Sequence, residues 1–392
     1  MKYYILFFKI SFIVIIITFI TCDRSTKEQI ANRKIELNST NSEQIKLSQI
    51  FSSADIFNLS TNDIVFERPK KILVKNNHFF MQSKTSIIIC DEFGYLVLYL
   101  FRKGNGPGEY IGIADFHVED NGNILINDTE GRKMIRYNFQ GEYINTINHN
   151  LVSYNFIKLN DKIYLNSGKF VNPQSEYEVN VWDEDKNSIV ERYMKQEKSL
   201  RYLSVLEYTN FSFFNDTLSY SQSFSNTIYQ LEKNQTPPRL YINFGKNNLP
   251  KKYTERYTDL RSLMENFWSS EYASRIDGYR EGRNFLFFAY SFQDKMPFFW
   301  LSKKGNDSYH FDKFEDDFLF PGVIQKTGYD FMPVFIDENY AYFSIDAYRF
   351  IELFDKIKTP MDGKWENQFL MEKTTEQIDE YSNALIIRYK IK

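Results

Sequence analysis

Short apolar runs separated by Asp/Gly turns recur along the chain. Residues 87–94 and 124–131 share the pattern I-x-I-x-D-x-x-G, with their aspartates 37 residues apart, and each is followed by a second apolar stretch, at 95–101 and 133–137. Two apolar runs joined by such a turn are typical of a β-hairpin. Less regular copies pair 163–165 with 179–182, 218–221 with 227–231, 285–288 with 298–301, and 340–343 with 349–353. The pattern therefore predicts six hairpins.

The spacing of these hairpins indicates the fold. Their starts are 37 to 67 residues apart, which favours an all-β fold, a six-bladed β-propeller of four-stranded antiparallel blades over residues 45–392, because a blade usually takes about 40–50 residues. A parallel solenoid needs a tighter and more regular period. The C-terminal residues 385–391 alternate like a half-exposed strand. We expect this strand to close the ring in a blade begun near the N-terminus, where 64–66 and 72–74 supply strands.

One stretch has the period of a helix. Apolar residues at positions 260, 263, 264, 267 and 268 follow the i, i+3, i+4, i+7, i+8 spacing, which predicts a short helical insertion near 254–272. We interpret its apolar stripe as packing on the propeller, and a partner-binding helix is the alternative. Residues 374–377 (T-T-E-Q) fit a capping box, which predicts that a second short helix starts there, before the last strand.

The N-terminus has the order of a secretory signal. Lys2 and Lys9 precede an apolar run at 10–20, and Cys22 follows it. A cysteine in this position resembles a bacterial lipobox, which implies that a lipoprotein signal peptide at 1–21 is cleaved and that Cys22 is acylated. An uncleaved anchor is the alternative. Either outcome holds the chain at a membrane surface.

The segment that follows, residues 22–44, is polar and charged with few apolar positions. Such a composition does not bury enough surface to offset the loss of chain entropy, so we predict a flexible tether. If Cys22 is acylated, Cys90 is the one remaining thiol, and no intramolecular disulfide can form. Stability must then come from the core.

Composition and charge narrow the class of protein. With 43% hydrophobic and 25% charged residues, the chain is neither disordered nor a multi-span membrane protein. Aromatic residues make up 18% of it, and strands accommodate large rings better than helices do. The formal net charge of −3 gives no basic footprint, which argues against nucleic acid as a partner.

The segment after the first hairpin carries a distinctive sequence. Residues 102–110 read R-K-G-N-G-P-G-E-Y and resemble the R-K-G-x-G-P-G-E-Y signature of a bacterial family of six-bladed β-propeller lipoproteins, distantly similar to NHL-repeat propellers. The likeness covers about residues 60–392 and includes 241–246 with 249–250, which are similar to a later FGK and LP segment of the family. It implies a propeller fold and an envelope location. The family's function is largely uncharacterised and often taken to be glycan-related.

The signature raises the question of a ligand site. Its residues are Arg102, Lys103, Gly104, Gly106, Pro107, Gly108, Glu109 and Tyr110. A phosphate-binding P-loop needs Gly-Lys-Ser/Thr at the start of a helix, and here Glu109 and Tyr110 follow the last glycine. We expect the three glycines to supply positive-φ positions in a connection between blades that Pro107 stiffens, with Arg102 and Glu109 paired across it. A ligand contact on the propeller face is the alternative.

No stretch of the sequence carries a complete catalytic or metal-binding motif. Residues 183–187 start like a calcium loop, but Ser188 and Met194 replace the required Gly and Glu, which predicts a hairpin turn. Residues 315–317 are interpreted as a solvated acidic loop, with cation binding as the alternative. The four histidines are too scattered in sequence for a zinc motif: His78, His117, His149 and His310. We predict no catalytic residue, no metal ligand and no cofactor.

Two classes of function stay open. The first is a binding or scaffolding module of the bacterial cell envelope, lipid-anchored through Cys22 at the outer membrane on its periplasmic or surface face, with a glycan or an envelope protein as partner. The alternative is a metal-dependent lactonase- or lyase-like propeller enzyme acting on sugars, because related six-bladed propellers hold a metal with acidic and Asn side chains around the central tunnel. Three or four such side chains converging at one tunnel mouth would favour the enzyme.

Overall fold

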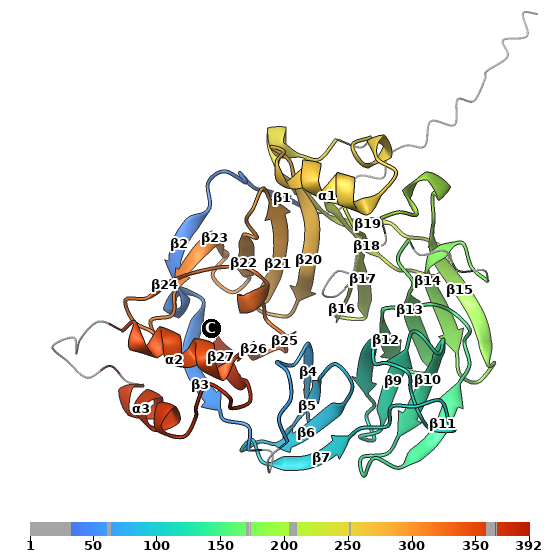
Figure 1. The fold of residues 1–392 in the computed structure, drawn as a ribbon. Coiled ribbons are helices and arrows are strands. Elements are labelled where there is room, and N and C mark those ends of the chain that lie inside the picture. The colour runs from blue at the N-terminus through green and yellow to red at the C-terminus, as the bar shows by residue number, and fades with distance from the viewer. Residues whose placement is uncertain are drawn as a thin grey trace, which may run out of the picture. The chain divides into compact units, whose positions relative to one another are not determined.

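Strands that follow one another along the chain form six antiparallel sheets, which are the blades of a β-propeller (Figure 1). The computed structural model describes residues 33–60, 64–169, 172, 174–203, 210–250, 252–357, 365 and 367–392. Residues 31–392 belong to one compact unit. The predicted all-β, six-bladed architecture is confirmed.

Blades 1 to 3 are each built from four consecutive strands. Blade 1 contains β4 (Lys71–Lys75), β5 (His78–Gln82), β6 (Ile87–Asp91) and β7 (Leu96–Leu100). Blade 2 contains β8 (Asp115–Val118), β9 (Ile124–Asp128), β10 (Lys133–Tyr137) and β11 (Tyr143–Ile147). Blade 3 contains β12 (Asn155–Leu159), β13 (Lys162–Asn166), β14 (Tyr177–Asp183) and β15 (Ser188–Lys195). The first strand β8 contacts both β4 and β12, the first strands of the neighbouring blades.

Blades 4 to 6 each include a strand from the N-terminal segment, which is an additional strand in blades 4 and 5 and the fourth strand in blade 6. Blade 4 contains β16 (Phe211–Phe214), β17 (Thr217–Ser221), β18 (Thr227–Gln230) and β19 (Pro238–Asn243), with β1 (Arg33–Glu36) parallel to β19. Blade 5 contains β20 (Ala273–Glu281), β21 (Phe285–Phe292), β22 (Phe298–Ser302) and β23 (Asp307–Glu315), with β2 (Glu43–Lys46) and β24 (Ile324–Lys326) on β23. Blade 6 contains β25 (Phe335–Ile336), β26 (Tyr340–Ile345), β27 (Leu385–Ile391) and β3 (Phe51–Phe57).

The apolar runs of the sequence are strands buried on both faces. In β6, Ile87 and Ile89 pack with residues of blade 2, whereas Ile88 and Cys90 pack with residues of blade 6. Successive side chains of a strand point to opposite faces, so an inner strand between two neighbouring blades must be apolar at every position. This packing explains why the run Ile87–Cys90 does not alternate with polar residues.

Five of the six predicted hairpins are confirmed, as β6–β7, β9–β10, β13–β14, β17–β18 and β21–β22. The sixth is wrong in its second half, because 349–353 lie in α2 (Ala347–Asp355) and β26 pairs with β27. The two copies of I-x-I-x-D-x-x-G are not equivalent: one spans the third and fourth strands of blade 1, the other the second and third strands of blade 2. The 37-residue offset is therefore not the blade repeat.

The ring closes between the two ends of the described chain. Strand β27 pairs antiparallel with β3, with Ile387 opposite Ile56, and both Nε and Nη2 of Arg388 donate to Asp55 Oδ2. Closure by the C-terminal strand is confirmed. Its N-terminal partner differs from the one predicted: residues 64–66 are not in a strand, and 72–74 lie in β4 of the next blade.

The N-terminal segment also corrects the predicted tether. Residues 33–36 and 43–46 form β1 and β2, and each pairs in parallel with the rim strand of a blade. Most of their side chains are exposed, so their polar composition reflects edge strands and not a flexible chain. Residues 1–32, which include Cys22 and the apolar run at 10–20, lie outside the described residues.

Among the described residues, three short α-helices lie on the propeller. The predicted insertion is confirmed as α1 (Leu260–Trp268), which buries Leu263 and Phe267 and is capped by Asp259. In α2, Ala347, Phe350 and Leu353 recur every three residues on the buried side, which makes this stretch a helix. The helix α3 (Gln368–Glu376) ends where the capping box predicted a start. Short 3-10 turns occur at η1 (Leu47–Gln49), η2 (Lys198–Leu200), η3 (Gly245–Asn247), η4 (Thr254–Arg256) and η5 (Tyr329–Phe331).

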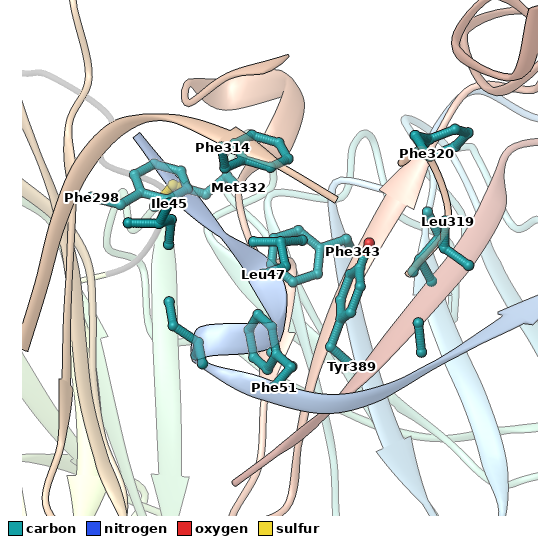
Figure 2. Close-up of a cluster of buried hydrophobic side chains, with 14 of the residues drawn as sticks. Ile45, Leu47, Phe51, Phe298, Phe314, Leu319, Phe320, Met332, Phe343 and Tyr389 are labelled. Atoms are coloured by element: carbon teal, nitrogen blue, oxygen red, sulfur yellow. The ribbon is translucent and has the colours of Figure 1, made fainter. Parts of the chain in front are cut away.

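The largest core cluster joins the N-terminal segment to blades 5 and 6. Figure 2 shows Ile45, Leu47 and Phe51 of that segment beside Phe343 and Tyr389. Phe51 stacks on Tyr389 with ring centroids 5.1 Å apart. Among the described residues, no helix has the length and apolar character needed to cross a bilayer.

Candidate functional site

A cavity of about 830 Å3 lies at the centre of the ring. Its walls come from the first strand of every blade: β4, β8, β12, β16, β20 and β25. This volume lies in the range of small-molecule binding sites. We call it the central cavity.

Asp115 joins the first three blades at the wall of this cavity. Its Oδ1 accepts hydrogen bonds from Lys71 Nζ of blade 1 at 2.7 Å and from Phe116 N at 2.8 Å, and its Oδ2 accepts one from Phe156 N of blade 3 at 2.9 Å. Asp115 is buried, and each carboxylate oxygen has a donor. The residue therefore acts first as a clamp between blades.

An amide cluster makes the same connection between blades 3 and 4. Asn155 Nδ2 and Asn166 Nδ2 both donate to Asn210 Oδ1, at 2.9 and 2.8 Å. Asn210 Nδ2 in turn donates to the carbonyl of Ser221 at 2.8 Å. Asn155 lines the central cavity and supplies a neutral polar group to it.

Glu281, at the end of β20, holds blade 5 to blade 4. Its carboxylate accepts hydrogen bonds from Arg239, Lys303 and the Tyr279 hydroxyl. Burial alone would raise the pKa of Glu281, but the hydrogen bonds from Lys303 and Arg239 outweigh it and lower the pKa. Glu281 therefore stays ionised, and its charge is neutralised by its own neighbours.

Hydrogen bonds of charged side chains also lie at the remaining junctions between blades. Arg283 N donates to Glu338 Oε2 at 2.9 Å between blades 5 and 6, and Arg68 Nη2 donates to the carbonyl of Tyr329 at 3.2 Å between blades 6 and 1. The charged groups of the inner ring are thus largely occupied by contacts between blades.

His117 contributes a neutral ring to the cavity. Burial, followed by the positive charges of Lys71 and Lys75, lowers its pKa to about 4. The imidazole is therefore unprotonated at neutral pH and offers one donor and one acceptor.

Two aromatic side chains of the cavity are only half buried. Phe213 on β16 is 45% exposed and Tyr329 in η5 is 46% exposed, although both line the cavity. Phe211 and Phe285, on the same wall, are buried as core residues are. Phe213 and Tyr329 thus present ring surface that the core does not use.

The acidic residues of the cavity do not fit a metal site. Asp115 is held by Lys71, Glu281 by two cations, and Glu338 by a backbone N–H, each at a different junction. In the part of the chain that the structure describes, no three His, Cys, Asp or Glu side chains come together as a metal-binding group. The geometry gives no support to the metal-dependent alternative.

The signature residues 102–110 lie away from the central cavity, in the connection from β7 to β8. The chain doubles back on itself there: Gly104 N donates to the carbonyl of Tyr110 at 2.9 Å, and Tyr110 N to the carbonyl of Arg102 at 3.0 Å. The buried Tyr110 hydroxyl donates to the carbonyl of Thr85 at 2.9 Å. These bonds fix the connection to blade 1.

Two details of the signature differ from prediction. Gly108 has a positive φ of 72°, whereas Gly104 and Gly106 do not have positive φ. Glu109 does not pair with Arg102; its Oε2 accepts a hydrogen bond from Gly106 N at 2.8 Å and fills the space beside Gly104. Glycine at 104 leaves room for this close approach, and its backbone angle does not require glycine.

The two acidic stretches have different outcomes. The predicted hairpin turn at 183–187 is confirmed, with Asp183 paired to Ser188 across β14 and β15. The interpretation of 315–317 as a solvated loop is wrong for Asp316, which is only 1% exposed. Its burial results from packing against Tyr389 of β27, far away in sequence.

Comparison with known proteins agrees with this architecture. The family model of a domain of unknown function, DUF4934, matches residues 32–390. A solved Bacteroides fragilis protein, named as exported, shares 16% identity and a TM-score of 0.72, over 92% of this chain and 99% of its own. A DUF4221 family member from Bacteroides vulgatus shares 12% identity and a TM-score of 0.49, over 87% of this chain and 97% of its own. No curated protein sequence matches the chain. Since the family model spans the whole propeller, the protein belongs to the DUF4934 family.

Proposed function

We propose that the protein is a carbohydrate-binding module of the bacterial cell envelope, held at a membrane by a lipid on Cys22, with the central cavity as its ligand site. The observation that carries this proposal is the pair of half-exposed rings, Phe213 and Tyr329, on the wall of a concave site. Aromatic rings offer a rigid apolar face at low entropic cost. The apolar face of a sugar ring suits such a surface.

The polar groups of the cavity favour a neutral, hydroxylated ligand. Lys71 and Asp115 neutralise each other, and Glu281 is neutralised by Arg239 and Lys303. A charged ligand that bound at Lys71, Asp115 or Glu281 would have to displace one of these pairs, which leaves a buried charge without its partner. Hydroxyl groups need no displacement, because His117 and Asn155 offer neutral donors and acceptors.

The envelope location rests on different observations. Cys22 directly follows the apolar run at 10–20, and the name of the Bacteroides fragilis protein of similar fold describes export. Labelled palmitate should be incorporated into the wild-type protein and not into Cys22→Ala. Equal labelling of both proteins would exclude acylation at Cys22.

The ligand class is tested by a glycan array with residues 31–392, followed by calorimetry on any glycan retained. Phe213→Ala should weaken binding about tenfold, the loss expected for one ring contact of about 1.4 kcal/mol, without changing the melting temperature. Phe101→Ala is the matched control, because Phe101 is 49% exposed but lies at the end of β7 on the rim. It should leave binding unchanged.

Two results would contradict the proposal. Failure of the protein to retain any glycan would direct the search to an envelope protein partner. Equal losses in Phe213→Ala and Phe101→Ala would show that the ligand does not use the central cavity.

A further inference from the structure

A second cavity, of about 530 Å3, lies beside blade 6. One wall is the connection from blade 5 to blade 6, which contributes Phe320 and Phe331. The other walls are β26 with Phe343, β27 with Tyr389, and the start of α2. We call it the blade-6 cavity. Tyr329 lines both this cavity and the central one.

Asp316 lines the blade-6 cavity with a buried carboxyl group. Its Oδ1 accepts hydrogen bonds from Phe318 N at 3.2 Å and Leu319 N at 3.1 Å, and its Oδ2 accepts one from the Tyr389 hydroxyl at 2.5 Å. All three donors are neutral, and among the described residues no Lys, Arg or His pairs with Asp316. Buried carboxylates are normally paired with a cation, so this one lacks a counter-charge.

Aromatic rings surround the same space. Phe331 stacks on Phe343 with ring centroids 4.5 Å apart, and Phe343 meets Tyr389 edge to face at 5.4 Å. Figure 2 shows Phe343 and Tyr389 together, with Phe320 labelled on the neighbouring segment. Phe314 stacks on Phe331 with ring centroids 3.9 Å apart, and Phe51 stacks on Tyr389, so the ring faces pack against one another and form an apolar wall beside the carboxyl group.

Charges at the rim of the cavity are largely balanced. Arg68 Nη1 lies 3.6 Å from Asp330 and 3.9 Å from Asp346, and Arg349 pairs with Glu352 on α2. Lys326 on β24 is exposed. A ligand anion reaching past this rim would meet the carboxyl group of Asp316, whereas a cation would supply the charge that the interior lacks.

We propose that the blade-6 cavity binds a small organic ammonium ion, whose charge pairs with the carboxylate of Asp316 and whose apolar part packs against the aromatic wall of the cavity. The site is separate from the central cavity and does not depend on the carbohydrate proposal. Burial raises the pKa of Asp316 to about 7, so a proton takes the place of the cation in the unliganded protein near neutral pH. Ligand binding therefore competes with protonation.

The proposal is tested with choline and its neutral analogue 3,3-dimethyl-1-butanol, in which carbon replaces the charged nitrogen. Calorimetry on residues 31–392 at pH 8 should show choline binding at least about tenfold more tightly, because only the cation pairs with the buried carboxylate of Asp316. The charge of choline does not change with pH. Its advantage should therefore fall as the pH is lowered through 7 and Asp316 becomes protonated.

Asp316→Asn removes the charge and keeps an oxygen atom that can accept the hydrogen bonds from Phe318 N and Leu319 N. It should abolish the preference for choline and leave binding of the neutral analogue unchanged. Asp317→Asn is the matched control, because this neighbouring carboxylate bonds to Ser48 and does not line the cavity; it should keep the preference. If Asp316→Asn does not fold, the pH dependence in the wild type decides.

Three results would overturn the inference. They are the absence of choline binding at millimolar concentration, equal affinity for choline and its analogue at pH 8, and an Asp316→Asn protein that still prefers choline. A preference that persists unchanged below pH 6 would show that the charge recognised is not that of Asp316.

Discussion

The clamp at Asp115 makes a quantitative prediction about what holds the blades together. Asp115→Ala leaves the N–H of Phe156, a buried residue, without its acceptor, which costs about 1–3 kcal/mol. It also removes the carboxylate partner of Lys71. Because the Lys71 side chain is 29% exposed, its ammonium can turn partly to water, so this loss adds about 1 kcal/mol. We expect the free energy of unfolding to fall by about 3 kcal/mol.

The assay is equilibrium unfolding in guanidinium chloride, followed by tryptophan fluorescence. Asp115→Asn should give an intermediate loss, because the amide oxygen still accepts one of the bonds. The matched control is Asp120→Ala. Lys75 and Asp120 also join blades 1 and 2, at the same 2.7 Å, but the Asp120 side chain is fully exposed, so its loss should have no measurable effect. Equal effects of Asp115→Ala and Asp120→Ala would refute the reasoning.

Three further predictions concern stability. Gly108→Ala should destabilise the fold by about 1–2 kcal/mol, because φ is positive and a Cβ would lie 2.9 Å from the Tyr143 ring; Gly112→Ala, without either feature, should lower the melting temperature less. Burial lowers the pKa of His149 to about 4 from its ordinary 6.5, so the unfolded chain binds the proton more readily and stability should fall as the pH drops from 6.5 towards 4. His149→Asn should weaken the dependence of the unfolding free energy on pH. Denaturation curves that give the same pH dependence for this variant and the wild type would contradict the prediction. A chain beginning at residue 47 lacks β1 and β2, exposes the edges of β19 and β23, and should aggregate faster than residues 31–392 by light scattering.

The fold was largely predictable because hairpins leave a local pattern. An apolar run, a turn and a second run identify β9–β10 or β21–β22 without knowledge of the rest of the chain. The position of a hairpin within its blade depends on the other strands of the sheet, which lie outside the hairpin motif. The same motif therefore marks different strands in blades 1 and 2. The strands β1 and β2 were missed because each has a single apolar side chain, Ile35 or Ile45, and is otherwise attached by backbone hydrogen bonds.

The sites were less predictable than the fold. The central cavity combines side chains from six strands spread over most of the chain, so no linear motif describes it. Asp115, Asn155 and Asn210 are polar residues at or next to first strands, which in hindsight is the one local signal for the clamps. Asp316 gave no such signal, because its acidic neighbours suggest solvent and only its contact with Tyr389 places it in the interior.

The closure of the ring sets an order of events during synthesis. Residues 51–57 are synthesised long before their partner strand, 385–391. The outer strand of blade 6 therefore waits for more than 300 intervening residues, since Asp55 and Arg388 are 333 apart. Contacts this distant in sequence form slowly. The strand β3 must stay without its partner, or be held by a chaperone, until β27 has been made.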